Sequence, residues 1–567
     1  MRSSLFLSFL LVAFLAQAQK AKLPADVKAH IEKRIEYGMS PSIVVGIIDE
    51  NGPVYFSFGK TEAGGAKVTE HSIYEIGSIS KTFTATLLAD QIIKGKMQAS
   101  DPAQTYLPAD VKMPMYEGQS ITLGHLSDHT SSLPRLPSNM APADLTNPYA
   151  DYTLEQLYSF LSSYTLPRPI GSEFEYSNLA VGLLGHILSL QAGKSYEELL
   201  VSTITRPLGM NETKITLDEN MKRNLAAGHS MGERVANWDL PTLAGAGAIR
   251  SSVYDMLRYV AVQLDPKGTP LSKAIQLTHV ARHDKANGAR VGLGWLMKGS
   301  GENEVIWHNG GTGGYRTFAG FSPLKKMGVV VMTNSDAGVD EIGFRLLDPN
   351  SPLSEVKEDI IVELKNTLDK KGPAELAARF STLKASGKYE VDEMSINGLG
   401  YHYLQGKKIK EALAIFEINM NEFPSSFNVY DSYAEALMED GQKELAIRHY
   451  KKSLELNPGN SNGVEMLAKM GVEYAPPKPQ IDEALLESYT GTYQLAPGFN
   501  IVITRKEMQL IGQATGQSAF ELYPKSENEF YLTVTEARAV FNVVDGKVVS
   551  MTWYQGGQVF ECPKLQQ

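Results

Sequence analysis

Strand-like segments lie at both ends of the first 350 residues, and a long helical stretch separates them. Apolar runs typical of strands occupy residues 43–48, 53–58, 303–307, 315–321 and 327–332. The first two are joined at Asn51-Gly52, a hairpin signal, and helices are expected near 25–37 and 339–347. Strands from both ends can share one layer only if the helices between them pack beside it. We predict an α+β domain, with an antiparallel sheet flanked by helices and an all-helical subdomain beside it.

A serine and a lysine stand three residues apart where a helix is expected to begin, in the run Ser78-Ile79-Ser80-Lys81. Positions i and i+3 share one face of a helix, so the Lys81 amine can reach the Ser78 hydroxyl. A serine needs such a partner to become a nucleophile. The same spacing follows Ser57, Ser322, Ser354 and Ser381, but only Ser78 has a tight-turn glycine before it and helical apolar periodicity after it.

Tyr176-Ser177-Asn178 precedes an apolar helix expected from residue 179 to about 190. In an extended loop, residues i and i+2 project to the same side, so Tyr176 and Asn178 can face one cavity. Taken alone, the tripeptide also fits a loop tyrosine followed by an asparagine helix cap.

Four glycines lie close together in the hairpin sequence that starts at Trp307-His308-Asn309-Gly310-Gly311. Such density suggests backbone that approaches a substrate carbonyl with N–H donors. A flexible structural turn is the competing interpretation.

The ordered set Ser78-x-x-Lys81, Tyr176-x-Asn178 and His308-x-Gly310 resembles the three motifs of the penicillin-recognising serine hydrolases, in particular the class C β-lactamase and D,D-peptidase branch. Three further segments, 126–134, 243–252 and 292–295, resemble sequences of the same branch. The resemblance covers roughly residues 25 to 350. It implies a β-lactamase-like catalytic domain with the active site between the sheet and the helical subdomain.

The resemblance also implies roles for the residues. Ser78 would attack an amide or ester carbonyl and form an acyl-enzyme, with Lys81 and Tyr176 sharing its proton; which of the two is the general base stays open. Asn178 would orient the substrate amide and Lys81. The N–H groups of Ser78 and Gly311 would hold the oxyanion.

Two positions depart from the pattern of that branch. His308 stands where true β-lactamases usually have lysine, so a fixed positive charge for a substrate carboxylate is missing and anionic β-lactams are less expected as substrates. Ser132 replaces a usual glycine in a segment we interpret as structural.

A second serine, in Gly228-His229-Ser230-Met231-Gly232, matches the nucleophile elbow of α/β-hydrolases. An elbow needs a buried strand before it and a helix after it, and neither flank fits. We expect a hairpin there instead.

Composition and the N-terminus indicate an exported multi-domain protein. The chain has 567 residues, a formal charge of −10 and a single cysteine, Cys562, which we expect to be packed in the last strand. The charge argues against nucleic-acid binding. Arg2, the apolar stretch 5–15 and Ala16-Gln17-Ala18 are typical of a signal peptide over residues 1–18. No later apolar run is long enough to span a membrane. We predict a periplasmic or secreted protein that needs no cofactor or metal.

After the catalytic domain (19–352), an internal period of 34 residues indicates tetratricopeptide-like repeats within 353–474. Pro424 and Pro458 are one such pair, as are Ala412 and Ala446. The repeats could bind a protein partner on a concave face or serve as a brace, and we favour the brace because the units are few. A Pro-rich linker is expected at 475–481, followed by a small all-β domain at 482–567.

We conclude that the sequence predicts an exported serine hydrolase that cleaves a peptide, a D-amino-acid amide, a β-lactam or a small ester. The alternative is an inactive envelope scaffold that binds partners through the repeats. The intact Ser78, Lys81, Tyr176 and Asn178 argue against that alternative.

Overall fold

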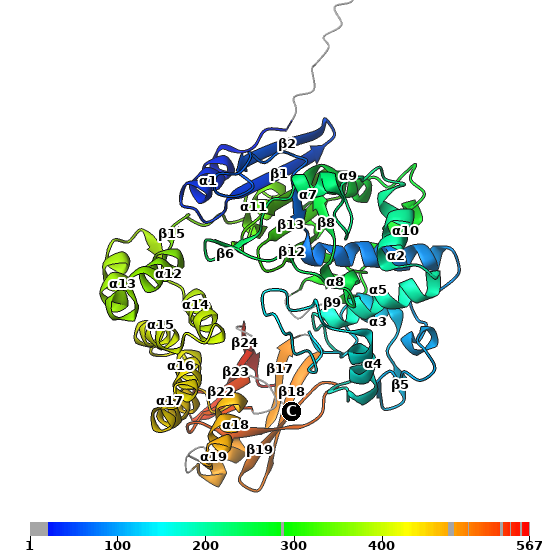
Figure 1. Cartoon of the computed structure of the whole chain (residues 1–567). Helices are drawn as coiled ribbons and strands as arrows, with labels where there is room; N and C mark the ends of the chain where they lie inside the picture. Colours follow the sequence, from blue (N-terminus) through cyan, green and yellow to red (C-terminus); the bar gives the residue numbers. More distant parts are fainter. Residues whose placement is uncertain are drawn as a thin grey trace, which may run out of the picture. The chain divides into compact units, whose positions relative to one another are not determined.

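The computed structural model describes residues 21–284, 288–474, 481–496, 498–532, 537–544, 546–555 and 558–565. The chain divides into two compact units, Met1–Glu358 and Asp359–Gln567 (Figure 1). The predicted signal peptide (1–18) and Pro-rich linker (475–481, apart from Ile481) lie outside the described residues, as do Val534 and Asp545 of the predicted β domain.

An eight-stranded antiparallel sheet forms the centre of the first unit, in the order β2-β1-β14-β13-β12-β11-β10-β9. Its strands are β1 (Ser42–Asp49), β2 (Gly52–Gly59), β9 (His283–Asp284), β10 (Arg290–Val291), β11 (Leu296–Lys298), β12 (Val305–Gly311), β13 (Arg316–Ser322) and β14 (Met327–Thr333). β1 pairs with β14, so the N-terminal hairpin joins strands from the far end of the unit. This confirms the antiparallel sheet expected from strands at both ends of the segment.

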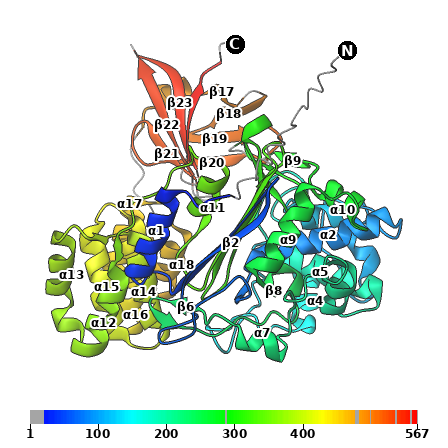
Figure 2. The ribbon, with the colours of Figure 1, turned by 90° about the horizontal axis from the view of Figure 1, so that it is seen from above.

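Two helices, α1 (Ala25–Glu36) and α11 (Asp340–Leu347), cover one face of this sheet, and α9 (Val253–Leu264) covers the other (Figure 2). Alternation along β1 explains the two layers, because Val45 packs in the cluster with α1 and α11 whereas Val44 packs in the cluster with α9. Gly46 allows close contact: a Cβ there would lie 3.0 Å from Val253 Cγ2.

Helices inserted between the strands form the predicted helical subdomain. They are α2 (Ser80–Ile93), α3 (Leu123–Ser127), α4 (Leu154–Ser163), α5 (Asn178–Ala192), α6 (Tyr196–Leu200), α7 (Glu219–Arg223), α8 (Ala244–Gly247) and α10 (Ser272–Thr278). Short strand pairs join them, namely β3 (Ile73–Glu75) with β8 (Arg250–Ser252), β4 (Met115–Tyr116) with β5 (Gln119–Ser120), and β6 (His229–Ser230) with β7 (Glu233–Arg234). α5 and α8 touch through glycines, since a Cβ on Gly185 would lie 2.9 Å from the Gly245 Cα.

The second unit begins with helices and ends with strands. The helices are α12 (Ile360–Lys371), α13 (Leu376–Ala385), α14 (Glu393–Gln405), α15 (Ile409–Glu422), α16 (Phe427–Glu439), α17 (Lys443–Leu456), α18 (Ser461–Lys469) and α19 (Glu483–Ser488), and a short pair joins β15 (Glu358–Asp359) to β16 (Tyr389–Glu390). Where the structure describes the chain, no helix is both long and apolar enough to cross a membrane.

The last eight strands form one antiparallel sheet that curls toward a barrel. They are β17 (Gly491–Ala496), β18 (Phe499–Lys506), β19 (Gln509–Ala514), β20 (Phe520–Pro524), β21 (Glu529–Tyr531), β22 (Ala537–Val544), β23 (Lys547–Gln555) and β24 (Gln558–Pro563). The two edges approach each other, because Leu565 N–H donates to Thr492 C=O. Cys562 is fully buried on β24, and burial raises its thiol pKa to about 11, as expected for a packed, unreactive residue. This confirms the small β domain.

Candidate active site

Ser78 lies in the 3₁₀ turn Gly77–Ile79, between β3 and α2. From residue 72 to residue 91 every residue is buried except Ser78. Gly77 takes a φ of +50°, which glycine adopts at little cost, and so turns the chain out of β3 into the helix. The fold therefore fixes this serine on a packed segment and opens only its side chain to solvent.

The Lys81 amine reaches the serine as the i, i+3 spacing predicts. Lys81 Nζ lies 2.9 Å from Ser78 Oγ and donates a hydrogen bond of 2.7 Å to the Ala246 carbonyl on α8. Lys81 is fully buried, and burial, followed by the nearby Arg135 charge, lowers its pKa well below the usual value. In its neutral form the Lys81 amine, with one N–H directed to Ala246, has its lone pair free to accept the serine proton.

The Tyr176 phenol hydrogen-bonds with Ser78, and burial raises its pKa. The His129 ring stacks on the Tyr176 ring at 4.5 Å between centroids. Lys81 Nζ and the Arg135 guanidinium carbon lie over the same ring, 4.9 Å and 5.3 Å from its centroid. The high pKa keeps Tyr176 protonated, so it can give a proton to a leaving group.

Strand β12 brings its backbone against the turn that holds Ser78. β11 pairs with β12 only from Val305 to Trp307. Beyond Trp307, residues 76 and 77 lie against residues 310 and 311 of β12. A Cβ on Gly77 would lie 2.6 Å from Gly311 N, and a Cβ on Gly310 would overlap the Ile76 carbonyl oxygen. Both glycines are therefore required by the close approach of two backbones.

The Gly311 N–H lies on the edge of β12 that faces the turn before Ser78, not on the edge that faces β13. Thr312 N–H donates to Tyr315 C=O, and Gly311 is opposite Arg316 in the next pair. Hydrogen-bonded and non-hydrogen-bonded pairs alternate along antiparallel strands, so the Gly311 N–H is directed away from β13. This orientation is compatible with the oxyanion contact that the sequence resemblance implies for the N–H groups of Ser78 and Gly311.

His308 on β12 is buried and neutral. Burial is the main cause that lowers its pKa to about 3, and a positive charge on Lys81 adds to this lowering when that amine is protonated. Its Nδ1 is 2.6 Å from the Asn309 carbonyl, so that nitrogen carries the proton, whereas the buried Nε2 has no hydrogen-bond partner among the described residues. His308 thus presents an acceptor at the site, and it supplies no fixed positive charge.

Asn178 is the first residue of α5, but Ser177, not Asn178, caps the helix by accepting the Ala180 N–H. The Asn178 amide donates to the Tyr149 hydroxyl at 3.1 Å, and its buried oxygen has no partner among the described residues. Tyr149 in turn packs against Trp238, with ring centroids 5.4 Å apart. Neither aromatic residue belongs to a recognisable motif, and the sequence analysis missed both.

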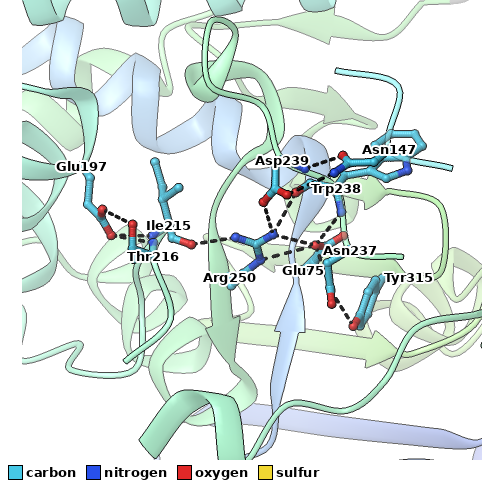
Figure 3. Close-up of polar contacts among 10 residues, drawn as sticks. All are labelled: Glu75, Asn147, Glu197, Ile215, Thr216, Asn237, Trp238, Asp239, Arg250 and Tyr315. Atoms are coloured by element: carbon cyan, nitrogen blue, oxygen red, sulfur yellow. Dashed lines mark hydrogen bonds and ion pairs between the residues drawn. The ribbon is translucent and has the colours of Figure 1, made fainter. Parts of the chain in front are cut away.

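Glu75 and Arg250 form a buried charge pair that contacts the backbone of Trp238 (Figure 3). Glu75, three residues before Ser78, accepts hydrogen bonds from Arg250, from the Asn237 amide and from the Trp238 N–H. Both charged side chains are less than a tenth exposed. Asn237 also donates to the Tyr315 hydroxyl.

This network joins three segments that border the site. Arg250 additionally donates to the Trp238 and Ile215 carbonyls. The chain leading to the nucleophile, the loop that carries Trp238 and the hairpin after β12 are thereby held in one arrangement.

The competing serine lies in a hairpin. Ser230 ends β6 and donates to Asp336 at 2.6 Å, and β7 follows it where an elbow would need a helix. Ser132 has a φ of +64°, a conformation that glycine adopts freely. This conformation accounts for the glycine that the resembled family usually has at this position.

The beta-lactamase family model matches residues 27–346, more than half of the chain. The chain therefore belongs to the beta-lactamase family and is a serine hydrolase. A second model, a domain of unknown function (DUF3471), matches residues 475–563.

Individual relatives agree. The D-alanyl-D-alanine-carboxypeptidase/endopeptidase AmpH of Escherichia coli (strain K12) is 32% identical over 360 residues, which cover 59% of this chain and 92% of that protein. A beta-lactamase of Pseudomonas fluorescens is 27% identical, covering 55% of this chain and 94% of its own length. The crystal structure of a beta-lactamase/D-alanine carboxypeptidase from Pseudomonas syringae has a TM-score of 0.51 at 20% identity, over 57% of this chain and 98% of its own, which shows a shared fold.

Proposed function

We propose that the protein cleaves an amide or ester through an acyl-enzyme on Ser78. The observation that carries this proposal is the buried Lys81 amine, 2.9 Å from the hydroxyl of Ser78, the one residue of the packed segment 72–91 that is not buried. A lysine kept neutral by burial is a general base at neutral pH, which an exposed lysine is not. No cofactor enters the scheme.

Lys81 takes the Ser78 proton as Oγ attacks the carbonyl carbon. The carbonyl oxygen becomes an oxyanion between the N–H groups of Ser78 and Gly311. Tyr176 protonates the leaving group, and water then releases the acyl group with the proton transfers reversed. The pKa of Lys81 is lowered, which supports its role as the base, and the pKa of Tyr176 is raised, which supports its role as the acid.

His308 in the third motif supplies no fixed positive charge for a substrate carboxylate, and this limits the substrate class. Two of the relatives are named beta-lactamase and D-alanyl-D-alanine-carboxypeptidase/endopeptidase, and we propose a peptide, a D-amino-acid amide, a β-lactam or a small ester as substrate for this chain. The unpartnered Asn178 oxygen supports a role in holding a substrate amide N–H. In the structure the Asn178 amide nitrogen bonds to Tyr149, so its proposed contact with Lys81 gains no support.

The test is acylation of matched serine variants. We expect wild-type protein incubated with a fluorescent penicillin or p-nitrophenyl acetate to form an adduct detected by intact mass, and Ser78→Ala to form none. Ser230→Ala is the control and should behave as wild type. Labelling of Ser78→Ala would refute the assignment, and loss of labelling in Ser230→Ala alone would favour an elbow nucleophile. No adduct and no turnover with either reagent would favour an inactive scaffold.

We further propose that α14 to α17 are two tetratricopeptide-type helix pairs that act as a brace. α16 begins 34 residues after α14, and α17 begins 34 residues after α15, which is the period of such repeats. A peptide-binding face is the alternative, and a protein partner stays a prediction. Limited proteolysis that leaves the four helices in one fragment would support the repeat unit, and early cleavage between α15 and α16 would contradict it.

Export is also a proposal. The charged start, short apolar stretch and small-residue site in residues 1–18 support it. N-terminal sequencing of the exported protein should find a mature chain that begins near Gln19, and retention of Met1 would contradict it.

A further inference from the structure

The active site contains one exposed cation that the proposed reaction does not use. Arg135 is exposed, and its guanidinium lies over the Tyr176 ring, 5.3 Å from the centroid. Among the described residues no carboxylate lies within the 4 Å of an ion pair with it. The other side-chain nitrogen over that ring, Lys81 Nζ, belongs to a fully buried residue that the proposed reaction uses as the base.

The backbone of Arg135 is fixed to the second motif. Its carbonyl accepts the N–H groups of Asn178 and Leu179 at 3.0 Å and 3.2 Å. The start of α5 therefore sets where this arginine stands relative to Tyr176. Its charge also reaches neighbouring groups, because it lowers the pKa of Lys81 and opposes the rise in the pKa of Tyr149 that burial causes.

His308 cannot supply the missing positive charge, because it is buried and neutral. An arginine that is exposed, unpaired and anchored at the site is suited to a planar anion, since guanidinium binds carboxylates with two parallel hydrogen bonds. We propose that Arg135 is a specificity-determining residue that selects substrates carrying a carboxylate close to the scissile bond. This inference rests on the proposed hydrolysis at Ser78.

A merely electrostatic role for Arg135 predicts something different. If its charge only tuned Lys81 and Tyr176, its loss would slow charged and neutral substrates by the same factor. If it binds the substrate anion, the loss falls on the charged substrate and raises KM. The two roles are separated by comparing substrates that differ in one charge.

The experiment uses two ester pairs and the full-length protein. In the first pair the charge is on the acyl side: the p-nitrophenyl monoester of adipic acid against its methyl ester. In the second the charge is on the leaving group: N-phenylacetylglycine esters of 3-hydroxybenzoic acid and of its methyl ester. Variants are Arg135→Ala and Arg135→Lys, with Arg223→Ala, an exposed arginine at the end of α7, as matched control.

We expect wild type to prefer the charged member of at least one pair, which locates the anion. Arg135→Ala should reduce that preference in kcat/KM by about 10-fold or more, Arg135→Lys should retain part of it, and Arg223→Ala should leave it unchanged. Salt should weaken the preference of wild type more than that of Arg135→Ala. An equal loss on both members of each pair, or an unchanged preference, would overturn the proposal.

A neutral fluorophosphonate probe is run in parallel. Labelling of Ser78 shows that the nucleophile reacts, so a failure of charge selection is told apart from a failure of the proposed hydrolysis. Absence of labelling and of turnover would overturn both. Thermal melting of each variant confirms that Arg135→Ala is folded, as expected for an exposed residue.

Discussion

Gly310→Ala is the sharpest test of the proposed oxyanion hole. The substitution adds one methyl group between β12 and the turn before Ser78. That methyl carbon would overlap the Ile76 carbonyl oxygen and would lie 2.5 Å from Thr317 Oγ1. Ordinary contacts of this kind begin at 3.4 Å, so the two backbones must separate by roughly 1.5 Å. The Gly311 N–H moves away from Ser78 with the strand.

The size of the effect follows from that displacement. A misplacement of about 1 Å costs roughly 100-fold in rate, and loss of one oxyanion donor costs about 100- to 1,000-fold in kcat. We expect a fall in that range for p-nitrophenyl acetate, measured by single-turnover acylation, with a cost in stability of about 1–3 kcal/mol from overpacking. Gly338→Ala is the matched control, because its new methyl would meet nothing within 4 Å. Acylation by Gly310→Ala within a few-fold of wild type would refute the proposed role of β12.

Two further predictions concern the charges of the site. The lowered pKa of Lys81 and the raised pKa of Tyr176 predict that kcat/KM for a neutral ester rises with pH through the lowered lysine pKa and stays high until Tyr176 ionises. His308, with its pKa lowered to about 3, should add no inflection near its usual value of about 6.5, and a fall in rate across neutral pH would contradict this assignment. Glu75→Gln should destabilise the first unit by about 3 kcal/mol in denaturant unfolding, since it removes the buried carboxylate that faces Arg250 and leaves only the exposed carboxylate of Asp239 beside the guanidinium. Glu62→Gln, which breaks an exposed pair, should cost less than about 1 kcal/mol, and equal costs would show that burial does not set the difference.

Those parts of the site that depend on local spacing could be predicted from the sequence. Ser78 and Lys81 are one helical turn apart, so any helix starting there brings them together. The glycines of β12 were predicted as backbone that must approach another group. In the structure that group is the backbone of the turn before Ser78, because Gly310 faces Ile76 and Gly311 faces Gly77. The strand positions followed from apolar runs in the same way.

Contacts between distant loops could not be predicted. Glu75 and Arg250 are separated by 175 residues, and nothing in either sequence context identifies the partner. Asn178 contacts Tyr149, whose loop has no periodicity or motif to place it. Arg135 directly follows a segment recognised as structural, and its importance appears only when the Tyr176 ring is seen beneath it.

The burial of α2 restricts how such a hydrolase can change during evolution. Because residues 72–91 are all buried except Ser78, a substitution at one of the buried positions disturbs the nucleophile and the core together. New substrate preferences are therefore accessible mainly through the loops that carry Arg135, Tyr149 and Trp238, which can vary in sequence while the reacting serine stays where it is.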